Sequence, residues 1–551
     1  ARYSHYLLCP SGLVPFQLPP VSQPLTLMNK IERIKADKDG LDVYPDLMRA
    51  AREGWETLSD DDVARLKWYG LYPHNTKDGH FMLRVKVVQG VLTGEQAETM
   101  AGIAADFGRG IIDCTTRQCF QIHWIRVEHT PEIYSRLEKV GLTVTGACGD
   151  IPRNVIGCTL AGIGHDQVVD GLQTSKDLHE HFLGSKLYSN LPRKFKISVT
   201  GCAEDCARGL INDLALSGVV AEDGTAGYNV RVGGGLSSAP RLSRWIDVFV
   251  TPEEAPALTQ GILEIFRDSE ELRAKRGRAR IKFLLDSMGP EAFREELERR
   301  VGRPLTRGVK TPGGLNGDDH IGVTPQQDGA HSAVGYCVPV GRLKAEQLLE
   351  FVRLAREYGS ADGEIRLTHQ QNVVVPFVRN ENVEALMAEP LSEALSPEPP
   401  LFMRGMQSCT GKEFCGLAKV YTKSRAVEIA RFLDAHVLPN GHGEDLRVHF
   451  AGCSSSCAQQ QIGDIGIEGV LKKVDGEFIE AMDIRIGGHL GENARFGDVV
   501  AKKIPHWDLN ETLLNIFTLY EQHHTATETF RDFAGRTEPE WWSERLELVE
   551  A

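Results

Sequence analysis

The sequence predicts an α+β fold that is internally duplicated. Two small α+β half-modules would pack about a pseudo-twofold axis, and two further α/β domains would follow them. A chain of 551 residues is too long for one hydrophobic core, which favours three to four domains. Blocks of the first half recur in the same order in the second half over roughly 200 residues, which indicates a duplication.

The first recurring block predicts a small sandwich of helices and strands. In each copy an amphipathic helix leads into a strand rich in β-branched residues, and a second helix follows. Strand and helix alternating in this way favour an α+β sandwich, present twice. The paired segments are 90–100 with 341–351, 112–125 with 365–378, and 131–140 with 382–391.

The second recurring block contains most of the cysteines. Its paired segments are 153–161 with the loop at 409–415, 196–206 with 447–457, 211–218 with 462–469, and 228–236 with 482–490. A charged helical stretch (256–303) and a glycine-rich linker (311–318) separate the halves. The resulting boundaries are 1–75 for an N-terminal arm, 76–146 and 311–395 for the half-modules, and 147–310 and 396–551 for the larger domains.

Composition excludes several classes of protein. The net charge of -14 argues against general binding to nucleic acid or to a membrane surface. No run of 18 apolar residues occurs, and prolines interrupt residues 1–28, which we expect to be a poorly ordered arm and not a signal peptide. Twelve cysteines in a chain of this length suit metal ligands and core thiols in a reducing compartment, so we expect a cytoplasmic protein.

Four cysteines in the last third indicate a metal centre. Cys409 and Cys415 form a C-x5-C pair, and Cys453 and Cys457 form a C-x3-C pair. Soft thiolates favour iron–sulfur or zinc, and a C-x5-C arm is atypical of zinc sites. The alternative is four buried structural cysteines, but both pairs are flanked by glycine and polar residues. An iron–sulfur centre is the stronger interpretation.

These cysteine pairs, set in duplicated halves, resemble the siroheme-containing nitrite and sulfite reductase family over about residues 66–532. The resemblance implies two ferredoxin-like half-modules and two siroheme and cluster domains. It also implies a [4Fe–4S] cluster on Cys409, Cys415, Cys453 and Cys457, with Cys457 bridging to the siroheme iron. It further implies an anion site formed by Arg84, Arg153, Lys194 and Lys196. Four cations would bind the anion, neutralise developing charge and deliver protons, and we expect depressed lysine pKa values among like charges.

The resemblance also implies a siroheme-binding segment at 115–123. Thr115, Arg117, Gln121 and His123 have the same parity, so we expect them on one face of a strand, where arginine suits the cofactor carboxylates. The Cys409 loop favours nitrite, reduced by six electrons to ammonium, whereas Lys196 is similar to the sulfite-reducing branch and keeps reduction of sulfite to sulfide as the alternative.

No dinucleotide fingerprint is present, so the resemblance implies ferredoxin as the electron donor to a monomeric enzyme. Ferredoxins are acidic, and one basic run could dock them, although a solvated helix face is an equal alternative. The run comprises Arg273, Lys275, Arg276, Arg278, Arg280 and Lys282.

Two questions stay open at this stage. Cys148, Cys158, Cys202 and Cys206 of the first half are not required by the implied cofactors. They could be core thiols, which we favour, or a vestigial or occupied second cluster site. The chain could also be a cluster-bearing electron-transfer protein without siroheme, although the four cations of the predicted anion site disfavour that class.

Overall fold

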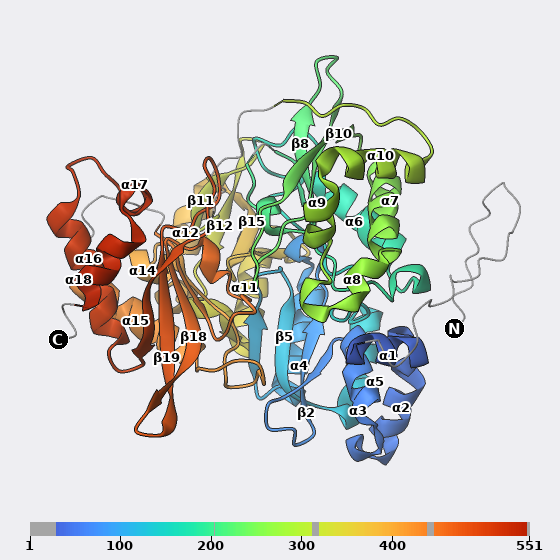
Figure 1. The fold of residues 1–551 in the computed structure, drawn as a ribbon, viewed down its shortest axis with the longest axis horizontal. Helices are drawn as coiled ribbons and strands as arrows, with labels where there is room; N and C mark the ends of the chain where they lie inside the picture. The colour runs from blue at the N-terminus through green and yellow to red at the C-terminus, as the bar shows by residue number, and fades with distance from the viewer. Residues whose placement is uncertain (1–28, 203, 311–318, 438–445, 548–551) are drawn as a thin grey trace, which may run out of the picture.

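Each half of the chain contributes one antiparallel sheet and one mixed sheet to the fold (Figure 1). The structure is a computed structural model that describes residues 29–202, 204–310, 319–437 and 446–547. Within these residues the strands form four five-stranded sheets. The predicted linker at 311–318 lies outside the described residues, as do residues 1–28.

The two antiparallel sheets exchange an edge strand, so the half-modules form one unit. Their orders are β1-β2-β5-β4-β13 and β11-β12-β15-β14-β3. Leu343 of β13 lies opposite Ile112, and Leu92 of β3 lies opposite Ile365. The strands are β1 (Leu71–Pro73), β2 (His80–Val85), β3 (Val91–Leu92), β4 (Ile111–Cys114), β5 (Phe120–Arg126), β11 (Gly322–Pro325), β12 (His331–Tyr336), β13 (Arg342–Lys344), β14 (Ile365–Leu367) and β15 (Val373–Arg379).

A single hydrophobic core fills the space between these two sheets and their helices. Helices α4 (Gly94–Phe107) and α11 (Ala345–Tyr358) pack against each other, and buried residues of both, such as Met100 and Phe351, belong to the same cluster. The remaining helices of the half-modules are α5 (Thr130–Lys139), α12 (Val383–Met387) and α13 (Leu391–Ala394). The predicted duplication about a pseudo-twofold axis therefore creates one shared core.

The two mixed sheets begin with parallel strands and end with antiparallel ones. In each, three strands pair in parallel and two more add in antiparallel fashion. The first contains β6 (Ile156–Gly157), β7 (Ile197–Thr200), β8 (Leu214–Val220), β9 (Ala226–Val232) and β10 (Arg244–Val250). The second contains β16 (Met406–Ser408), β17 (Val448–Ala451), β18 (Ile465–Val474), β19 (Glu477–Ile486) and β20 (Asp498–Pro505).

Helices cover each mixed sheet on the outside of the molecule, as Figure 1 shows for α7 and α10 at one end and α16 and α18 at the other. The first group comprises α6 (Gly171–Phe182), α7 (Ala255–Arg267), α8 (Glu270–Ala274), α9 (Ile281–Met288) and α10 (Pro290–Val301). Helices α7 to α10 confirm the helical stretch predicted for 256–303. The second group comprises α14 (Leu401–Gly405), α15 (Lys423–His436), α16 (Leu509–His523), α17 (Phe530–Arg536) and α18 (Pro539–Glu547). None of the described helices is both long and apolar enough to cross a membrane.

The segment predicted as an N-terminal arm (1–75) is helical over much of its described part. Residues 30–65 form helices α1 (Lys30–Asp37), α2 (Tyr44–Glu53) and α3 (Asp60–Arg65). Val43 and Leu47 are fully buried in the core of the half-modules, and the Trp68 indole donates a hydrogen bond to the Ser189 carbonyl at 2.8 Å. Apolar burial on this scale orders the segment and joins it to the first mixed-sheet domain.

The duplication extends to individual side chains of the two mixed sheets. Asp213 accepts a hydrogen bond from the Lys196 backbone N–H at 2.8 Å and pairs with Arg280. Its counterpart Asp464 accepts from the Arg447 N–H at 2.9 Å and likewise pairs with an arginine, Arg531. Equivalent buried carboxylates thus fix the start of β7 and the start of β17. These two strands lead into the two C-x3-C loops.

Candidate active site

The four cysteines predicted as ligands follow two parallel strands. Cys409 comes directly after β16, and Cys453 lies two residues after β17. Because the carboxyl ends of parallel strands meet at one edge of a sheet, the two cysteine loops lie together. The Gly452 N–H donates to Cys409 Sγ at 3.2 Å, and the charges of Cys453 and Cys457 both act on Cys415.

This quartet is spaced for a group larger than one ion. Among the described residues, one group of His and Cys side chains has all its ligand atoms within 4.8 Å of one another. That group lies elsewhere in the fold, and the four thiols of this site do not belong to it. Burial raises the pKa of Cys409 to about 12, so a cationic group would be needed to hold it as a thiolate. An all-thiolate set with open spacing fits a [4Fe–4S] cluster better than a zinc ion.

Arg84 extends from β2 of the first half toward this region. Its guanidinium donates to Cys148 Sγ at 3.0 Å and lies over the Tyr72 ring, with 5.9 Å between the guanidinium carbon and the ring centroid. With the Gln121 amide oriented to satisfy both groups, Gln121 accepts hydrogen bonds from Arg84 Nη2 and Nε, the latter at 3.2 Å. Neighbours on three sides therefore hold the Arg84 side chain in place.

The other three predicted cations lie close together. Arg153 donates from Nε and Nη2 to the Gly149 carbonyl at 3.0 and 2.6 Å. The pKa of Lys194 falls to about 7, chiefly because of burial and then because of the neighbouring Arg280 guanidinium. Burial and the adjacent Lys194 also place the pKa of Lys196 well below its ordinary value. The predicted depression of the lysine pKa values is confirmed.

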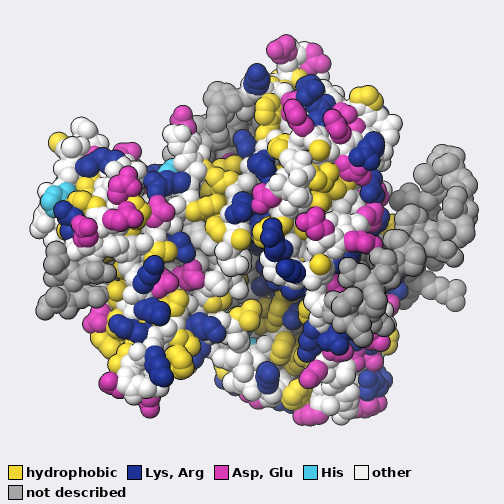
Figure 2. All heavy atoms as spheres, viewed as in Figure 1, with side chains coloured by type: hydrophobic (Ala, Val, Ile, Leu, Met, Phe, Trp, Pro, Cys, Tyr) yellow, Lys and Arg dark blue, Asp and Glu magenta, His cyan; other side chains and the backbone are white. Residues whose placement is uncertain are grey.

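The cations of the first half and the cysteines of the second half meet at Cys457. The charge of Cys457 acts on both Arg84 and Lys194, and the Thr116 hydroxyl donates to the Cys457 carbonyl at 3.1 Å. Figure 2 shows the molecule hollowed between the lobe of β18 and β19 and the sheet that contains β2 and β5, with Lys and Arg side chains around the hollow.

The expectation that Thr115, Arg117, Gln121 and His123 share one strand face is wrong for the first two. Residues 115–119 form the turn between β4 and β5, so strand parity does not apply to them. The Thr115 hydroxyl closes this turn by accepting from the Arg117 and Cys119 N–H groups at 3.3 and 3.2 Å. A turn still brings Arg117 inward, where it donates to Asn212 Oδ1 at 2.9 Å.

His123 lies on β5 and contacts the cysteine loop. Its ring stacks on Phe414, with centroids 3.8 Å apart, and its Nε2 lies 3.4 Å from the buried Asp113 carboxylate. Burial lowers the pKa of His123, and Asp113 only partly offsets that effect. The side chain therefore packs the half-module against the loop between Cys409 and Cys415.

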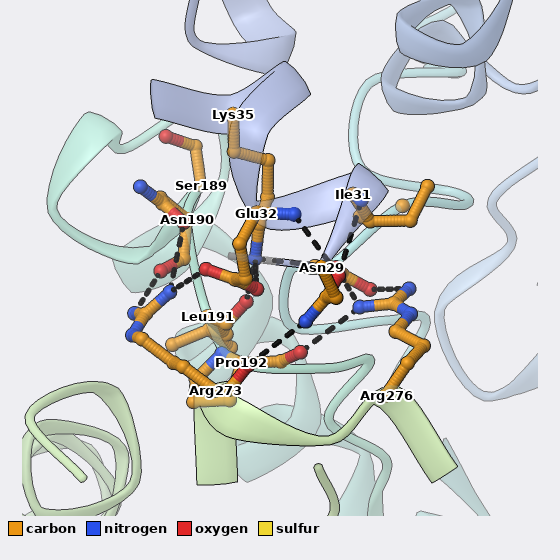
Figure 3. A network of polar contacts seen from close by, with 12 residues as sticks. Asn29, Ile31, Glu32, Lys35, Ser189, Asn190, Leu191, Pro192, Arg273 and Arg276 are labelled. Carbon is orange, nitrogen blue, oxygen red and sulfur yellow. Dashed lines mark hydrogen bonds and ion pairs between the residues drawn. The ribbon is translucent and has the colours of Figure 1, made fainter. Parts of the chain in front are cut away.

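The predicted docking run does not form a continuous exposed surface. Arg273 pairs with Glu32 at 2.8 Å (Figure 3), and Arg276 pairs with Asp150 at 2.5 Å. Arg280 is buried against Asp213, and Lys282 donates to the Leu236 carbonyl at 2.9 Å. Within the run, exposed side chains belong to Lys275 and Arg278. Four of the six side chains are therefore engaged within the molecule, and a role in docking would rest on Lys275 and Arg278.

Sequence reasoning missed several contributors to the site. Thr116 binds the Cys457 loop, Cys148 and Tyr72 hold Arg84, and Arg280 adds positive charge beside Lys194. A usable signal existed for Arg280, because the repeated Ile-x-Asp of 211–213 and 462–464 places equivalent acidic residues that each need a basic partner.

The fold and the site together define a duplicated α+β protein of the redox-cofactor class, in which one half supplies thiols and the other supplies cations. Family models agree with this description. The nitrite and sulphite reductase 4Fe-4S domain matches residues 148–305, and the nitrite/sulfite reductase ferredoxin-like half domain matches 72–140 and 324–393. The chain belongs to the nitrite and sulphite reductase family. The two half-domain matches confirm the predicted ferredoxin-like duplication.

Individual relatives match nearly the whole chain. The assimilatory ferredoxin-dependent nitrite reductase of Haloferax mediterranei is 37% identical over 95% of this chain and 94% of its own length. The chloroplastic ferredoxin–nitrite reductase of Zea mays is 38% identical over 88% of this chain and 87% of its own. The solved structure of the Mycobacterium tuberculosis NirA protein superposes with a TM-score of 0.89 at 31% identity, covering 94% of this chain and 97% of that one.

Proposed function

We propose that this chain is a ferredoxin-dependent nitrite reductase that converts nitrite to ammonium with six electrons. The observation that carries the proposal is the meeting of first-half cations with Cys457 of the second half. When bound, siroheme and a [4Fe–4S] cluster would supply an iron that takes up the anion and a store of electrons. Cys409, Cys415, Cys453 and Cys457 would hold the cluster, Cys457 would also ligate the siroheme iron, and Thr115, Arg117, Gln121 and His123 would line the siroheme pocket.

Arg84, Arg153, Lys194 and Lys196 would bind and neutralise the anion. Reduction of nitrite to ammonium takes up six electrons and eight protons and releases two waters, so positive charge and proton donors are both needed. The planar guanidinium groups of Arg84 and Arg153 would orient the anion. Lys194, with a pKa of about 7, can give up a proton and regain it near neutrality.

A separate protein would deliver the electrons. No dinucleotide-binding fingerprint occurs in the sequence, and the relatives are named for their dependence on ferredoxin. The electron donor must approach the cluster closely, and Cys457 is exposed while Cys409, Cys415 and Cys453 are only partly buried. The donor would therefore dock near the cysteine loops.

Reduction of sulfite to sulfide is the second candidate, and Lys196 favours it. A lysine at this position is similar to the sulfite-reducing branch. It lies among Lys194, Arg117 and Arg280, and an anion more highly charged than nitrite would favour its protonated form more strongly. Purified protein should yield extractable siroheme and produce ammonium from nitrite. Iron–sulfur absorption without siroheme would instead indicate an electron-transfer protein.

A further inference from the structure

The first half contains a compact group of potential metal ligands outside the candidate active site. The ligand atoms of Cys158, Cys206 and His320 all lie within 4.8 Å of one another, and all three side chains are buried. The Sγ of Cys158 is 3.6 Å from the Nε2 of His320. Two sulfurs and one nitrogen facing one point from three separate segments are typical of a metal site.

Cys202 lies outside this 4.8 Å group but beside Cys206, so its sulfur would have to move inward to become a fourth ligand. It forms the C-x3-C pair with Cys206 and contacts that side chain directly, with Asp166 also beside it. Cys158 follows β6 and Cys202 follows β7, and these strands pair in parallel, so the two loops meet at one edge of the sheet. The loops of Cys409 and Cys453 meet in the same way after β16 and β17 of the second half.

The spacing of Cys158, Cys206 and His320 fits one ion. With Zn–S near 2.3 Å and Zn–N near 2.0 Å, tetrahedral angles place a sulfur and a nitrogen about 3.5 Å apart. The distance of 3.6 Å between Cys158 and His320 agrees with this value. A four-iron cluster has a wider core and spreads its ligands further, as the open spacing at Cys409, Cys415, Cys453 and Cys457 shows within the same duplicated frame.

We propose that Cys158, Cys202, Cys206 and His320 bind a structural zinc ion. Three thiolates and one imidazole form a closed tetrahedral set, which leaves no position for a substrate. Binding releases the thiol protons and involves no change of redox state. This one-ion site would lie at the position that matches the cysteine loops of the second half, and the second half would contribute His320 to it.

The site joins the two halves of the chain. His320 lies just before β11, the first strand of the second half-module, whereas the cysteines belong to the first half. Neighbouring contacts cross the same boundary: Arg366 Nη1 donates to the Thr159 and Ala161 carbonyls at 2.9 and 2.8 Å, and the Gln327 N–H donates to the Ile163 carbonyl at 3.0 Å. A zinc ion here would fix the entry of the chain into the second half.

The test is metal analysis of the full-length holoprotein, purified after growth with both iron and zinc. We expect about one zinc per chain, and zinc-edge X-ray absorption should show three sulfurs near 2.3 Å and one nitrogen near 2.0 Å. This absorption edge is separate from that of iron, so the cluster and the siroheme do not interfere. Cys206→Ser and His320→Ala should lose most of the zinc. Cys337→Ser, which alters a buried cysteine outside the group, should keep it.

Four results would overturn the proposal. These are no zinc in the wild-type protein, a disulfide between two of the three cysteines found by mass spectrometry, about eight cluster irons per siroheme, and a Cys206→Ser variant that retains its zinc. The wild-type determination decides the question even if a variant fails to fold. It is also independent of activity, so it holds whichever anion the enzyme reduces.

Discussion

Gln118 and Gln371 make the same cross-half hydrogen bond in opposite directions. Gln118 Nε2 of the first half donates to the Leu367 carbonyl of the second at 3.0 Å, and Gln371 Nε2 donates to the Cys114 carbonyl of the first at 3.0 Å. Both side chains are buried. Their amide oxygens accept from backbone N–H groups of the mixed sheets, Gly157 for Gln118 and Ser408 for Gln371.

Replacing either glutamine should destabilise the junction between the halves. Gln118→Ala or Gln371→Ala leaves a buried carbonyl and a buried N–H without partners, which should cost about 1–3 kcal/mol. Thermal unfolding of the holoprotein measures the effect as a lowered Tm. Gln522→Ala, on the exposed side of α16, is the control and should change stability by less than about 0.5 kcal/mol. Equal Tm values for the buried variants and this control would contradict the symmetric junction.

Cys457→Ser tests the thiolate bridge. Loss of an outer partner of a metal ligand costs about 10–100-fold in activity or metal affinity, so loss of the bridging ligand should reduce nitrite turnover by more than about 100-fold. Because Cys457 is exposed, the fold should survive. Electron paramagnetic resonance should show the siroheme and cluster uncoupled. Ser455→Ala in the same loop should retain turnover within about twofold. Full activity in Cys457→Ser would refute the bridge.

The binding of nitrite should weaken as pH rises through neutrality. The folded pKa of Lys194 is about 7, so the ammonium is charged below that pH and is lost above it, while nitrite stays anionic. With reduced viologen as donor, KM for nitrite should therefore rise between about pH 6 and 8. Lys194→Met should raise KM about tenfold at the lower pH and flatten the profile, because a charged hydrogen bond is lost.

The control for this pH series is Lys473→Met, which removes an exposed lysine of β18 and should reproduce the wild-type profile. An unchanged pH profile in Lys194→Met would remove Lys194 from the anion site.

Neutralising Lys275 and Arg278 should leave ferredoxin-driven turnover unchanged. These are the exposed members of the basic run, and two surface charges contribute little to a docking surface. The double variant Lys275→Gln, Arg278→Gln should keep the wild-type KM for ferredoxin and its salt dependence. Arg276→Gln is the informative comparison, since it leaves Asp150 without this partner and should lower Tm. A smaller salt dependence in the double variant would instead support the docking role.

The sequence was most informative where the chemistry is local. The spacing of Cys409 with Cys415 and of Cys453 with Cys457 predicted one shared site, and the parallel pairing of β16 with β17 brings the two loops together. The repeat pattern also predicted the two half-modules. Each of these inferences needs only short-range spacing or the order of segments along the chain.

Other features depend on contacts that no local pattern contains. Strands β3 and β13 each pair with a strand of the other half, which lies far away in the sequence. Arg273 and Arg276 looked solvated because their acidic partners, Glu32 and Asp150, lie far away in the sequence. His320 likewise lies far in the sequence from the first-half cysteines that it approaches. The strand-face error at Thr115 arose because a tight turn interrupts the alternation.

The most direct test of the proposed function is a side-by-side measurement of kcat/KM for nitrite and sulfite with reduced ferredoxin as donor, together with ammonium and sulfide analysis. The account predicts that nitrite is the better substrate, that one ammonium forms for each nitrite consumed, and that Arg84→Met loses most of this activity while retaining siroheme. A higher kcat/KM for sulfite, or full nitrite turnover in Arg84→Met, would contradict it.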